Sequence, residues 1–514
     1  MKNKLVWVWL FLAYILLAWK NPYLQNNLIG NLEPYPDTLY YSVPAWNLIN
    51  GNGFVMGVGS KRINSIVPPL YGLTLVPVFG VTHDVRSFYW LNIILAGVSL
   101  GLFIKLASKL VSNNWLITGV GLIWVTNFYN YNLPSLLMAE NLLVPLTLST
   151  VLVLLEKNSI ENIRWSILVG GLLLLTKMSA LPVVAILVVG MAVKIYFSKN
   201  IKLQKTGLIY GMLFVVIAGA YLRTNLPIWS IGNSDMKIGN LIKNSQIYFY
   251  QIMGVGSTYL WYVNPLLDWF VGVLALGGIL VGVISKKTRI LSLVTGGTVV
   301  VVVLFHAMKF YPEGRYVSTV VPLVILMLGV LIASLGKVKY LGMWLLLLVY
   351  FGQRVGVNGF YERKITTVKR QVMNNFRVDN EVPWNYNSVQ FFNNYFQKTD
   401  NKIYLATLLP AFYVNYFSNQ NYEILPVSET QEFSSGGKDL IGQYYRNDGS
   451  IVKMFQRLIE SGGDVYITNY YLQNHRADWE ADYNKIENSF AFKQVASGCM
   501  DLCKIYKLED KKKF

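Results

Sequence analysis

The sequence predicts a polytopic α-helical membrane protein with a small α/β domain at its C-terminal end. Of its 514 residues, 54% are hydrophobic and only 14% are charged, against roughly 25% charged in a soluble domain. Apolar runs of bilayer length fill the first 355 residues, and beyond residue 380 they shorten to the length of strands. Because such a chain cannot cover its surface with charge, lipid must be part of its solvent. The 34 Tyr and 14 Trp residues suit two membrane–water interfaces.

Eleven apolar runs are long enough to span, or nearly span, a bilayer. We expect the first run to be an uncleaved helix, because no small-x-small cleavage motif follows it. The stretch 66–81 is short and carries three prolines, so we expect an interfacial helix on the outer face, within a first outer loop at 20–86. The eleven runs are 5–19, 87–107, 115–130, 137–155, 165–178, 180–196, 206–223, 265–284, 289–306, 316–335 and 339–353.

Basic residues predict the orientation in the cell membrane. With the N-terminus inside, fifteen Lys and Arg fall in cytoplasmic segments and nine in the outer loops before residue 350, with Lys177 counted separately. This asymmetry is typical of a cytoplasmic N-terminus. We therefore expect a transmembrane domain at 1–355, a linker at 356–379 and a soluble extracytoplasmic α/β domain at 380–514.

The net charge of +18 does not indicate a nucleic-acid partner. Residues 1–379 carry 31 Lys and Arg against 11 Asp and Glu, whereas the remainder carries 14 against 16. The excess follows loop ends in the apolar part, which indicates membrane topology and contact with anionic lipid. Two Cys and three His residues exclude a zinc cluster and an extended disulfide framework.

The C-terminal region alternates strand-like and helix-like patterns, which predicts an α/β domain. Lys402–Ala406 and Asp464–Thr468 resemble buried strands, and Ser450–Ile459 resembles an amphipathic helix. Cys499 and Cys503 flank a predicted turn. They either form a disulfide that closes the hairpin or remain two structural thiols.

Asp37 follows the first helix, in the segment EPYPDTLYY that begins at Glu33. A carboxylate among aromatic and proline residues near the lipid surface is partly desolvated, which raises its pKa and strengthens it as a base. The alternative is a helix N-cap for a segment beginning at Thr38. Lys61 and Arg62 lie later in the same loop, where they either bind a lipid phosphate or extend to the interface as a charged pair.

Lys177 interrupts a long apolar run. A charge there costs roughly 3 kcal/mol of insertion free energy, which favours a functional role; the alternative is an ordinary lysine in an outer turn. Glu140 begins the run after Met138-Ala139, either as a second carboxylate of a site or as a charge that suits a helix N-terminus. His306 and Arg315 fall in another outer loop, either as site residues or in a solvated turn.

Short motifs in a fixed order connect these residues. The order resembles the membrane-embedded GT-C glycosyltransferases, in the protein O-mannosyltransferase-like branch that includes the lipid A aminoarabinose transferases, over about residues 1–340. The motifs are Pro36-Asp37-x-x-Tyr40-Tyr41, Asn47-Leu48-Ile49-Asn50-Gly51-Asn52-Gly53-Phe54, Pro68-Pro69-Leu70-Tyr71, Phe79-Gly80, Arg86-(x)₄-Leu91-Asn92, Ala139-Glu140-Asn141-Leu142, Gly171-(x)₄-Thr176-Lys177 and Arg315-Tyr316-(x)₅-Pro322.

The resemblance implies transfer of a sugar from a polyprenyl-phosphate carrier to an acceptor hydroxyl of a protein, lipid or glycan, outside the cytoplasm. It implies that Asp37 is the general base and that cations hold the carrier phosphate. Val67 stands where the family often has His or Lys before Pro-Pro-Leu, so that contact would come from elsewhere, such as Lys61 or Arg62. The expected site comprises Asp37 as base, Glu33 and Glu140 as supporting carboxylates, and Lys61, Arg62, Lys177, His306 and Arg315 at the donor phosphate.

Two other functions compete with this interpretation. A transporter or flippase of lipid-linked glycans would share a basic cavity, although transporters usually show paired repeats and no internal duplication is visible here. A polymerase that joins lipid-linked units is the second. The sequence assigns no cofactor or metal ligand and leaves the use of a divalent metal, the sugar and the acceptor open.

Overall fold

The structure is a computed structural model, and the chain divides into two compact units that are described separately below. The helical unit comprises Met1–Asn26, Ile66–Thr74 and Ser87–Asp379, and the sheet unit comprises Asn27–Ser65, Leu75–Arg86 and Asn380–Phe514. The residues described are 2–19, 38–51, 53–55, 67–83, 87–111, 113–127, 130, 133–198, 200–229, 238–242, 244, 245, 248, 265–286, 288–308, 314–358, 384–407, 421–428, 450–469, 477–499 and 503–511.

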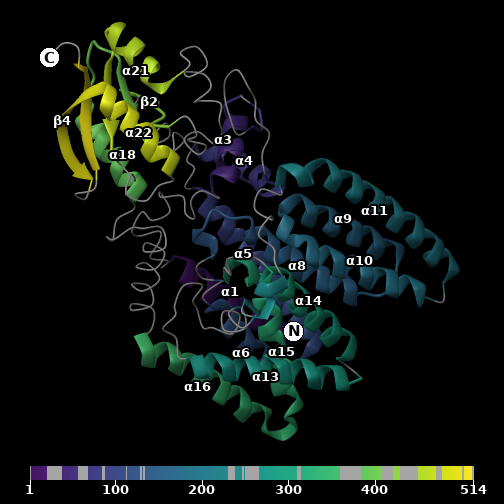
Figure 1. The fold of residues 1–514 in the computed structure, drawn as a ribbon. Helices are drawn as coiled ribbons and strands as arrows, with labels where there is room; N and C mark the ends of the chain where they lie inside the picture. Colours follow the sequence, from purple (N-terminus) through teal and green to yellow (C-terminus); the bar gives the residue numbers. More distant parts are fainter. Residues whose placement is uncertain are drawn as a thin grey trace. The chain divides into compact units, whose positions relative to one another are not determined.

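Each of the eleven apolar runs contains a helix of the helical unit (Figure 1). The helix α4, Leu70–Thr82, lies in the stretch expected to form an interfacial helix, and its residues divide between the two units. The other helices are α1 Lys2–Trp19, α5 Phe88–Leu110, α6 Asn114–Val125, α8 Glu140–Leu155, α9 Ile160–Thr176, α10 Leu181–Tyr196, α11 Ile201–Trp229, α13 Pro265–Ile284, α14 Arg289–Ala307, α15 Val321–Ser334 and α16 Lys339–Asn358. Short 3₁₀ turns are η3 Leu133–Ser135, η4 Met178–Ala180, η6 Ile238–Asn240, η7 Gly314–Val317 and η8 Gly336–Val338.

Side-chain caps fix where several of these helices begin. The Asn113 side chain accepts a hydrogen bond from the backbone N–H of Trp115 at the start of α6. Ser159 does the same for Asn162 at the start of α9. Both satisfy backbone donors that have no partner inside the helix. In α10 the first turn carries Pro182, a position where proline is tolerated because the missing N–H would be unpaired in any case.

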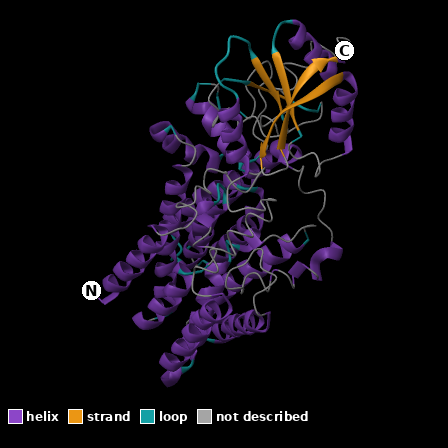
Figure 2. Ribbon diagram, turned by 90° about the vertical axis from the view of Figure 1, so that its left-hand side faces the viewer, coloured by secondary structure: helices purple, strands orange, loops and turns teal. Residues whose placement is uncertain are grey.

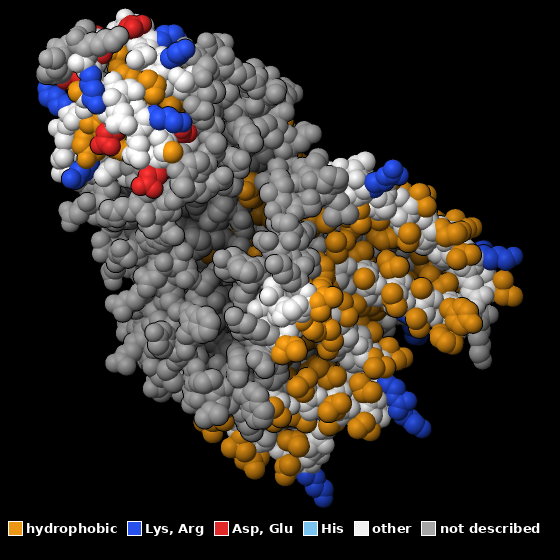
Figure 3. Space-filling view, in the orientation of Figure 1, with side chains coloured by type: hydrophobic (Ala, Val, Ile, Leu, Met, Phe, Trp, Pro, Cys, Tyr) orange, Lys and Arg blue, Asp and Glu red, His pale blue; other side chains and the backbone are white. Residues whose placement is uncertain are grey.

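Four helical segments in the described part of the chain are long and apolar enough to cross a membrane, and several shorter apolar helices accompany them. The four are Phe88–Leu110, Met178–Tyr196, Ile201–Asn225 and Arg289–Ala307. Their exposed side chains are largely aliphatic, for example Leu208 and Val216 on α11. On the face seen in Figure 3, hydrophobic side chains spread over the helices and Lys and Arg side chains stand at the edges. The chain is a multi-pass membrane protein in its helical unit, because only lipid matches such a surface.

Close packing of helices in this unit depends on glycine. A methyl group at Gly278 of α13 would overlap the carbonyl oxygen of Met327 in α15. A methyl group at Gly282, one turn later, would overlap the Ser292 hydroxyl of α14. Small residues let the backbones of two helices approach each other closely. Close packing matters in a membrane because the hydrophobic effect does not favour helix–helix contact over helix–lipid contact. The glycines therefore set the close approach of α13 to its two neighbours.

The sheet unit contains a β-sheet with helices beside it (Figure 2). The sheet has five strands in the order β2-β1-β3-β5-β4. β1 pairs in parallel with β2 and with β3, while β5 pairs antiparallel with both β3 and β4. The elements of this unit are α3 Leu39–Ile49, α18 Trp384–Tyr395, β1 Ile403–Ala406, β2 Glu423–Leu425, α21 Ile451–Glu460, β3 Asp464–Thr468, α22 Ala477–Ser489, β4 Phe490–Cys499 and β5 Cys503–Asp510.

Helices cover both faces of this sheet. On β3, Val465 and Ile467 point into a core that includes side chains of α21 and α22, such as Phe455. Tyr466 between them points the opposite way, and its ring packs 5.0 Å from that of Phe396, just after α18. The expected small C-terminal α/β fold is therefore confirmed, with both predicted strands and the predicted amphipathic helix present.

One turn of the sheet unit follows from a sequence motif, and a second predicted feature concerns the two cysteines. Gly51 and Gly53 both have positive φ, which favours glycine, and Asn47 donates to the carbonyl oxygen of Val55 at 2.8 Å across them. Cys499 and Cys503 are opposite each other where β4 and β5 pair, so both alternatives for these thiols are compatible with the strand register. Their side chains lie outside the described part of the chain.

Candidate functional site

The four candidates of the first outer loop, Glu33, Asp37, Lys61 and Arg62, lie outside the described residues. Description resumes at Thr38, which occupies the position before the first helical residue of α3 and makes no cap hydrogen bond with its side chain. The catalytic role of Asp37 thus stays a prediction from the sequence.

Glu140 and Lys177, which are far apart in the sequence, form an ion pair. Lys177 Nζ lies 2.6 Å from Glu140 Oε1, and the side chains are 16% and 1% exposed respectively. Glu140 is the first residue of α8, as expected, and Lys177 lies between α9 and η4. Lys177 is therefore mostly buried and charge-paired, unlike a solvated turn lysine. Its burial depends on a partner contributed by another helix.

Aromatic rings from a third segment extend this contact. Lys177 Nζ lies 5.7 Å from the centre of the Tyr316 ring in η7, within range of a cation–π interaction. The Tyr316 ring stacks on buried His306 at the end of α14, with centroids 5.1 Å apart. Three of the expected site residues, Glu140, Lys177 and His306, thus share one end of the helical unit. The side chain of Arg315 lies outside the described residues.

A framework of buried amides holds the segment that precedes α8. Asn92 of α5 donates to the carbonyl oxygens of Pro134 and Leu136, at 3.1 Å and 2.9 Å. Asn141 donates to the carbonyl oxygens of Leu136 and Met138, both at 3.0 Å. These bonds stop the helix from extending backward through the apolar run. As a result, α8 begins at Glu140 rather than at residue 137.

Tyr71 of α4 completes this framework, because its hydroxyl donates to Asn92 Oδ1 at 2.8 Å. Tyr71 also lies within electrostatic reach of Glu140. Tyr71, Asn92 and Asn141 all stood in the sequence motifs, but no role was assigned to them from the sequence. Each is buried in the structure. The sequence signal for them was a polar residue within an apolar run, since a buried polar group needs a hydrogen-bond partner.

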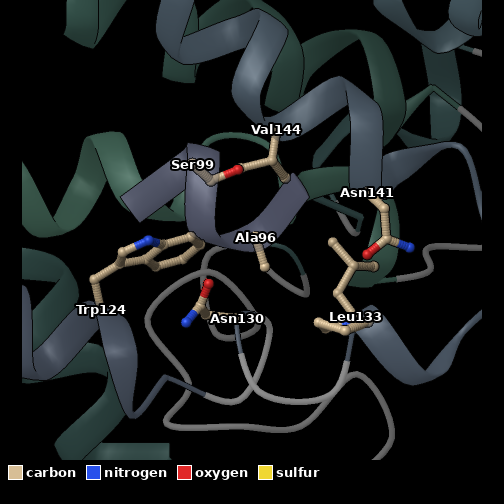
Figure 4. A pocket seen from close by; sticks show the side chains of 8 residues that line it. Ala96, Ser99, Trp124, Asn130, Leu133, Asn141 and Val144 are labelled. Carbon is tan, nitrogen blue, oxygen red and sulfur yellow. The ribbon is translucent and has the colours of Figure 1, made fainter. Parts of the chain in front are cut away.

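A small pocket lies beside this framework, between α5, α6 and α8 (Figure 4). Trp124 contributes its buried indole, and within the described residues its Nε1–H has no hydrogen-bond partner. The free space suits about one water molecule. The lining is mainly apolar and comprises Ala96, Ser99, Trp124, Asn130, Leu133, Pro134, Asn141 and Val144.

The opposite end of α8 carries a second ion pair. Lys109 of α5 lies 3.0 Å from Glu156, with side chains 36% and 44% exposed. The hydrogen bond from Lys109, together with the charges of Lys109, Lys105 and Lys194, lowers the pKa of Glu156. Lys194 also donates to the carbonyl oxygen of Glu156 at 2.7 Å, which satisfies a free backbone acceptor at the helix end.

The buried end of α8 has the chemistry of a binding site for an anion beside a carboxylate. Lys177 is the more accessible member of its pair and carries three N–H donors. In the described part of the chain, no group of three or more His, Cys, Asp or Glu side chains could hold a metal ion. A ligand here would meet the Lys177 ammonium group, beside the buried Glu140 carboxylate and the Tyr316 ring.

Comparison with solved structures identifies the fold. The crystal structure of ArnT from Cupriavidus metallidurans in the apo state matches with a TM-score of 0.58 at 12% identity, covering 98% of this chain and 97% of that one. The same protein bound to undecaprenyl phosphate matches with a TM-score of 0.56 at 12% identity, covering 98% of both chains. No family profile and no curated protein sequence matches. The expected resemblance to GT-C glycosyltransferases is thus confirmed for the fold.

Proposed function

We propose that the chain is an integral membrane glycosyltransferase that moves a sugar from a polyprenyl-phosphate-linked donor to an acceptor hydroxyl. The ion pair between Glu140 and Lys177, which unites two expected site residues at one end of a helical unit, is the observation that carries the proposal. The fold supports it, because ArnT, with the same fold, has been solved with undecaprenyl phosphate bound. The acceptor belongs to a protein, a lipid or a glycan.

The residues divide into two roles in this proposal. Lys177 and the predicted cations Lys61, Arg62, His306 and Arg315 bind the donor phosphate. Asp37 acts as general base, and Glu33 and Glu140 support the site as further carboxylates. No step in this scheme requires a metal ion, and the use of one stays open.

The reaction is a single displacement at the anomeric carbon. The acceptor oxygen forms a bond to this carbon while the bond from the carbon to the phosphate oxygen breaks. The acceptor proton goes to Asp37, and the bonding electrons leave with the polyprenyl phosphate. Because one carboxylate acts on the face opposite the leaving group, the configuration at the carbon inverts. Cations near the phosphate stabilise the charge that develops there.

Replacement of Asp37 by Asn tests the base. Asn keeps the size and the capping ability of Asp but cannot take a proton, so we expect sugar transfer to fall by roughly 10² to 10⁴-fold, while donor binding persists. The assay is transfer from polyprenyl-phosphate sugar by purified protein in liposomes. Asp84→Asn, an acid in the same predicted loop, is the matched control. Wild-type transfer by Asp37→Asn would favour the cap interpretation, and Glu140 or Glu33 would then be examined.

We further propose eleven membrane crossings, a cytoplasmic N-terminus and an extracytoplasmic domain at 380–514, after the linker at 356–379. A single cysteine at Thr430, in a chain with both native cysteines replaced by Ser, should react with an impermeant thiol reagent from the outside of intact cells. Reaction only after permeabilisation would reverse this topology.

A further inference from the structure

The two members of the Glu140–Lys177 pair differ in access. The lysine side chain is 16% exposed, whereas the carboxylate is 1% exposed. An incoming anion can therefore approach Lys177 Nζ while the carboxylate stays in place behind it. Lys177 has three N–H donors, and the structure gives one of them to Glu140 Oε1. The ammonium group can thus bind a phosphate without first leaving Glu140.

Within the described residues, the charge of Glu140 has little compensation apart from Lys177. Its second oxygen, Oε2, is buried without a hydrogen-bond partner within the described residues. The side-chain amides of Asn141 and Asn92 donate to backbone carbonyl oxygens instead. Among the described residues, Lys177 is therefore the main counter-charge of a carboxylate at the first turn of α8. A phosphate on Lys177 would lie next to this negative charge.

We propose that Glu140 is a fixed counter-charge that makes the Lys177 site select phosphodiesters over phosphomonoesters. The inference rests on the proposed function. A polyprenyl-phosphate sugar is a phosphodiester with one negative charge, whereas the polyprenyl phosphate that leaves is a monoester whose second pKa is about 6. The product therefore carries nearly two charges at neutral pH. Repulsion from Glu140 grows with the charge of the phosphate and acts more strongly on the product.

This selection gives a reason for a buried carboxylate at a phosphate site. A purely cationic site would bind the doubly charged product more tightly than the singly charged donor and would be inhibited by it. Glu140 opposes that tendency and favours product release. It acts on the charge of the bound phosphate and not on the reacting atoms, so it is a specificity-determining residue rather than a catalytic one.

Binding of two lipid phosphates tests the inference. The probes are polyprenyl monophosphate and its methyl ester, a phosphodiester that carries no sugar, with the purified full chain in nanodiscs at pH 7.5. Wild-type protein should bind the diester at least as tightly as the monoester. In Glu140→Gln, which keeps the volume and an oxygen for Lys177, monoester affinity should rise by about tenfold, and diester affinity by about threefold or less, because the repulsion scales with charge.

The ratio of the two affinities separates this role from a structural one, because general damage to the site would weaken both ligands. Glu156→Gln, at the exposed end of the same helix, should leave both affinities unchanged. An unchanged ratio in Glu140→Gln, or a lower monoester affinity, would overturn the inference. If this variant does not fold, the affinities of the wild-type protein test the inference by themselves. Clearly tighter binding of the monoester than of the diester would overturn the inference. Failure of the wild-type protein to bind either lipid would instead reject the proposed donor class.

Discussion

The helix α8 has an acidic residue at each end, and the two carboxylates are stabilised in different ways. Glu140 is 1% exposed and pairs with Lys177 at 2.6 Å, whereas Glu156 is 44% exposed and pairs with Lys109 at 3.0 Å. The nitrogen–oxygen distances are similar. The difference lies in the solvent, because water compensates Glu156 whenever Lys109 moves away, while Glu140 has Lys177 as its main partner. Distance alone therefore does not measure the importance of an ion pair.

The helix dipole separates the two ends further. A carboxylate suits the positive N-terminal end, where Glu140 lies, and is unfavourable at the C-terminal end, where Glu156 lies. The structure places Lys105, Lys109 and Lys194 within electrostatic range of Glu156. These cations offset both the carboxylate and the helix end. The exposed end is thus basic overall, while the charges of Glu140 and Lys177 cancel at the buried end.

The largest expected effect breaks the buried pair. Lys177→Met leaves the Glu140 carboxylate buried without its ammonium, which should lower the free energy of unfolding by about 3–5 kcal/mol. Lys109→Met, the matched change at the exposed end, should cost about 1 kcal/mol or less. Reversible unfolding in SDS–detergent mixtures measures both. Equal losses in the two variants would show that burial does not distinguish the pairs.

A middle-sized effect concerns the aromatic ring beside the buried pair, compared with a half-exposed ring elsewhere in the helical unit. Tyr316→Leu removes the ring that faces Lys177 and stacks on His306, which should cost about 1–2 kcal/mol. Trp344→Leu removes a ring that lies 5.4 Å from that of Trp115 and is half exposed, so its cost should be about 0.5 kcal/mol. The same unfolding assay compares them. A larger loss in Trp344→Leu would reverse the order of the two sites.

The smallest effect is a pH dependence at the exposed end. The folded pKa of Glu156 lies below its ordinary value of 4.5, so its stabilisation is complete above pH 4.5 and is lost as the pH falls through the folded pKa. Acidification from pH 5 to pH 3 should therefore lower the melting temperature of the wild type slightly more than that of Glu156→Gln. The difference should shrink in about 1 M salt, where the Debye length is about 3 Å. A salt-independent difference would indicate a role other than the surface pair.

Much of the fold could be predicted from the sequence because its signals are local. Every apolar run contains a helix, because a long apolar segment is stable in lipid only when its backbone forms its own hydrogen bonds. The strand at 464–468 was predicted with its observed bounds because strand length and turn residues mark it. Helix ends were predicted less well. The helix α11, for example, covers Ile201–Trp229, whereas its apolar run was 206–223. It begins earlier because the Asn200 side chain accepts a hydrogen bond from the backbone N–H of Leu203 in its first turn.

The candidate site was predicted in part. The sequence singled out Lys177 and Glu140 as charges within or beside apolar runs, since such residues are costly unless something compensates them. It singled out His306 as a titratable residue in an outer loop. It did not identify their partners. Tyr316 appeared only within a motif, and the roles of Tyr71 and Asn92 depend on hydrogen bonds between segments that are far apart in the chain.

The sequence by itself determined that this protein has a lipid-facing helical part, a small α/β part and a few charges too costly to lack partners. These properties follow from the composition and periodicity of short segments. Composition and periodicity are the same whatever tertiary structure the chain adopts. Only the tertiary structure decided that Glu140 pairs with Lys177, and that one end of α8 is buried while the other meets water. A pairing depends on which helix ends converge, and burial depends on all the neighbours together, so neither is encoded at any single position.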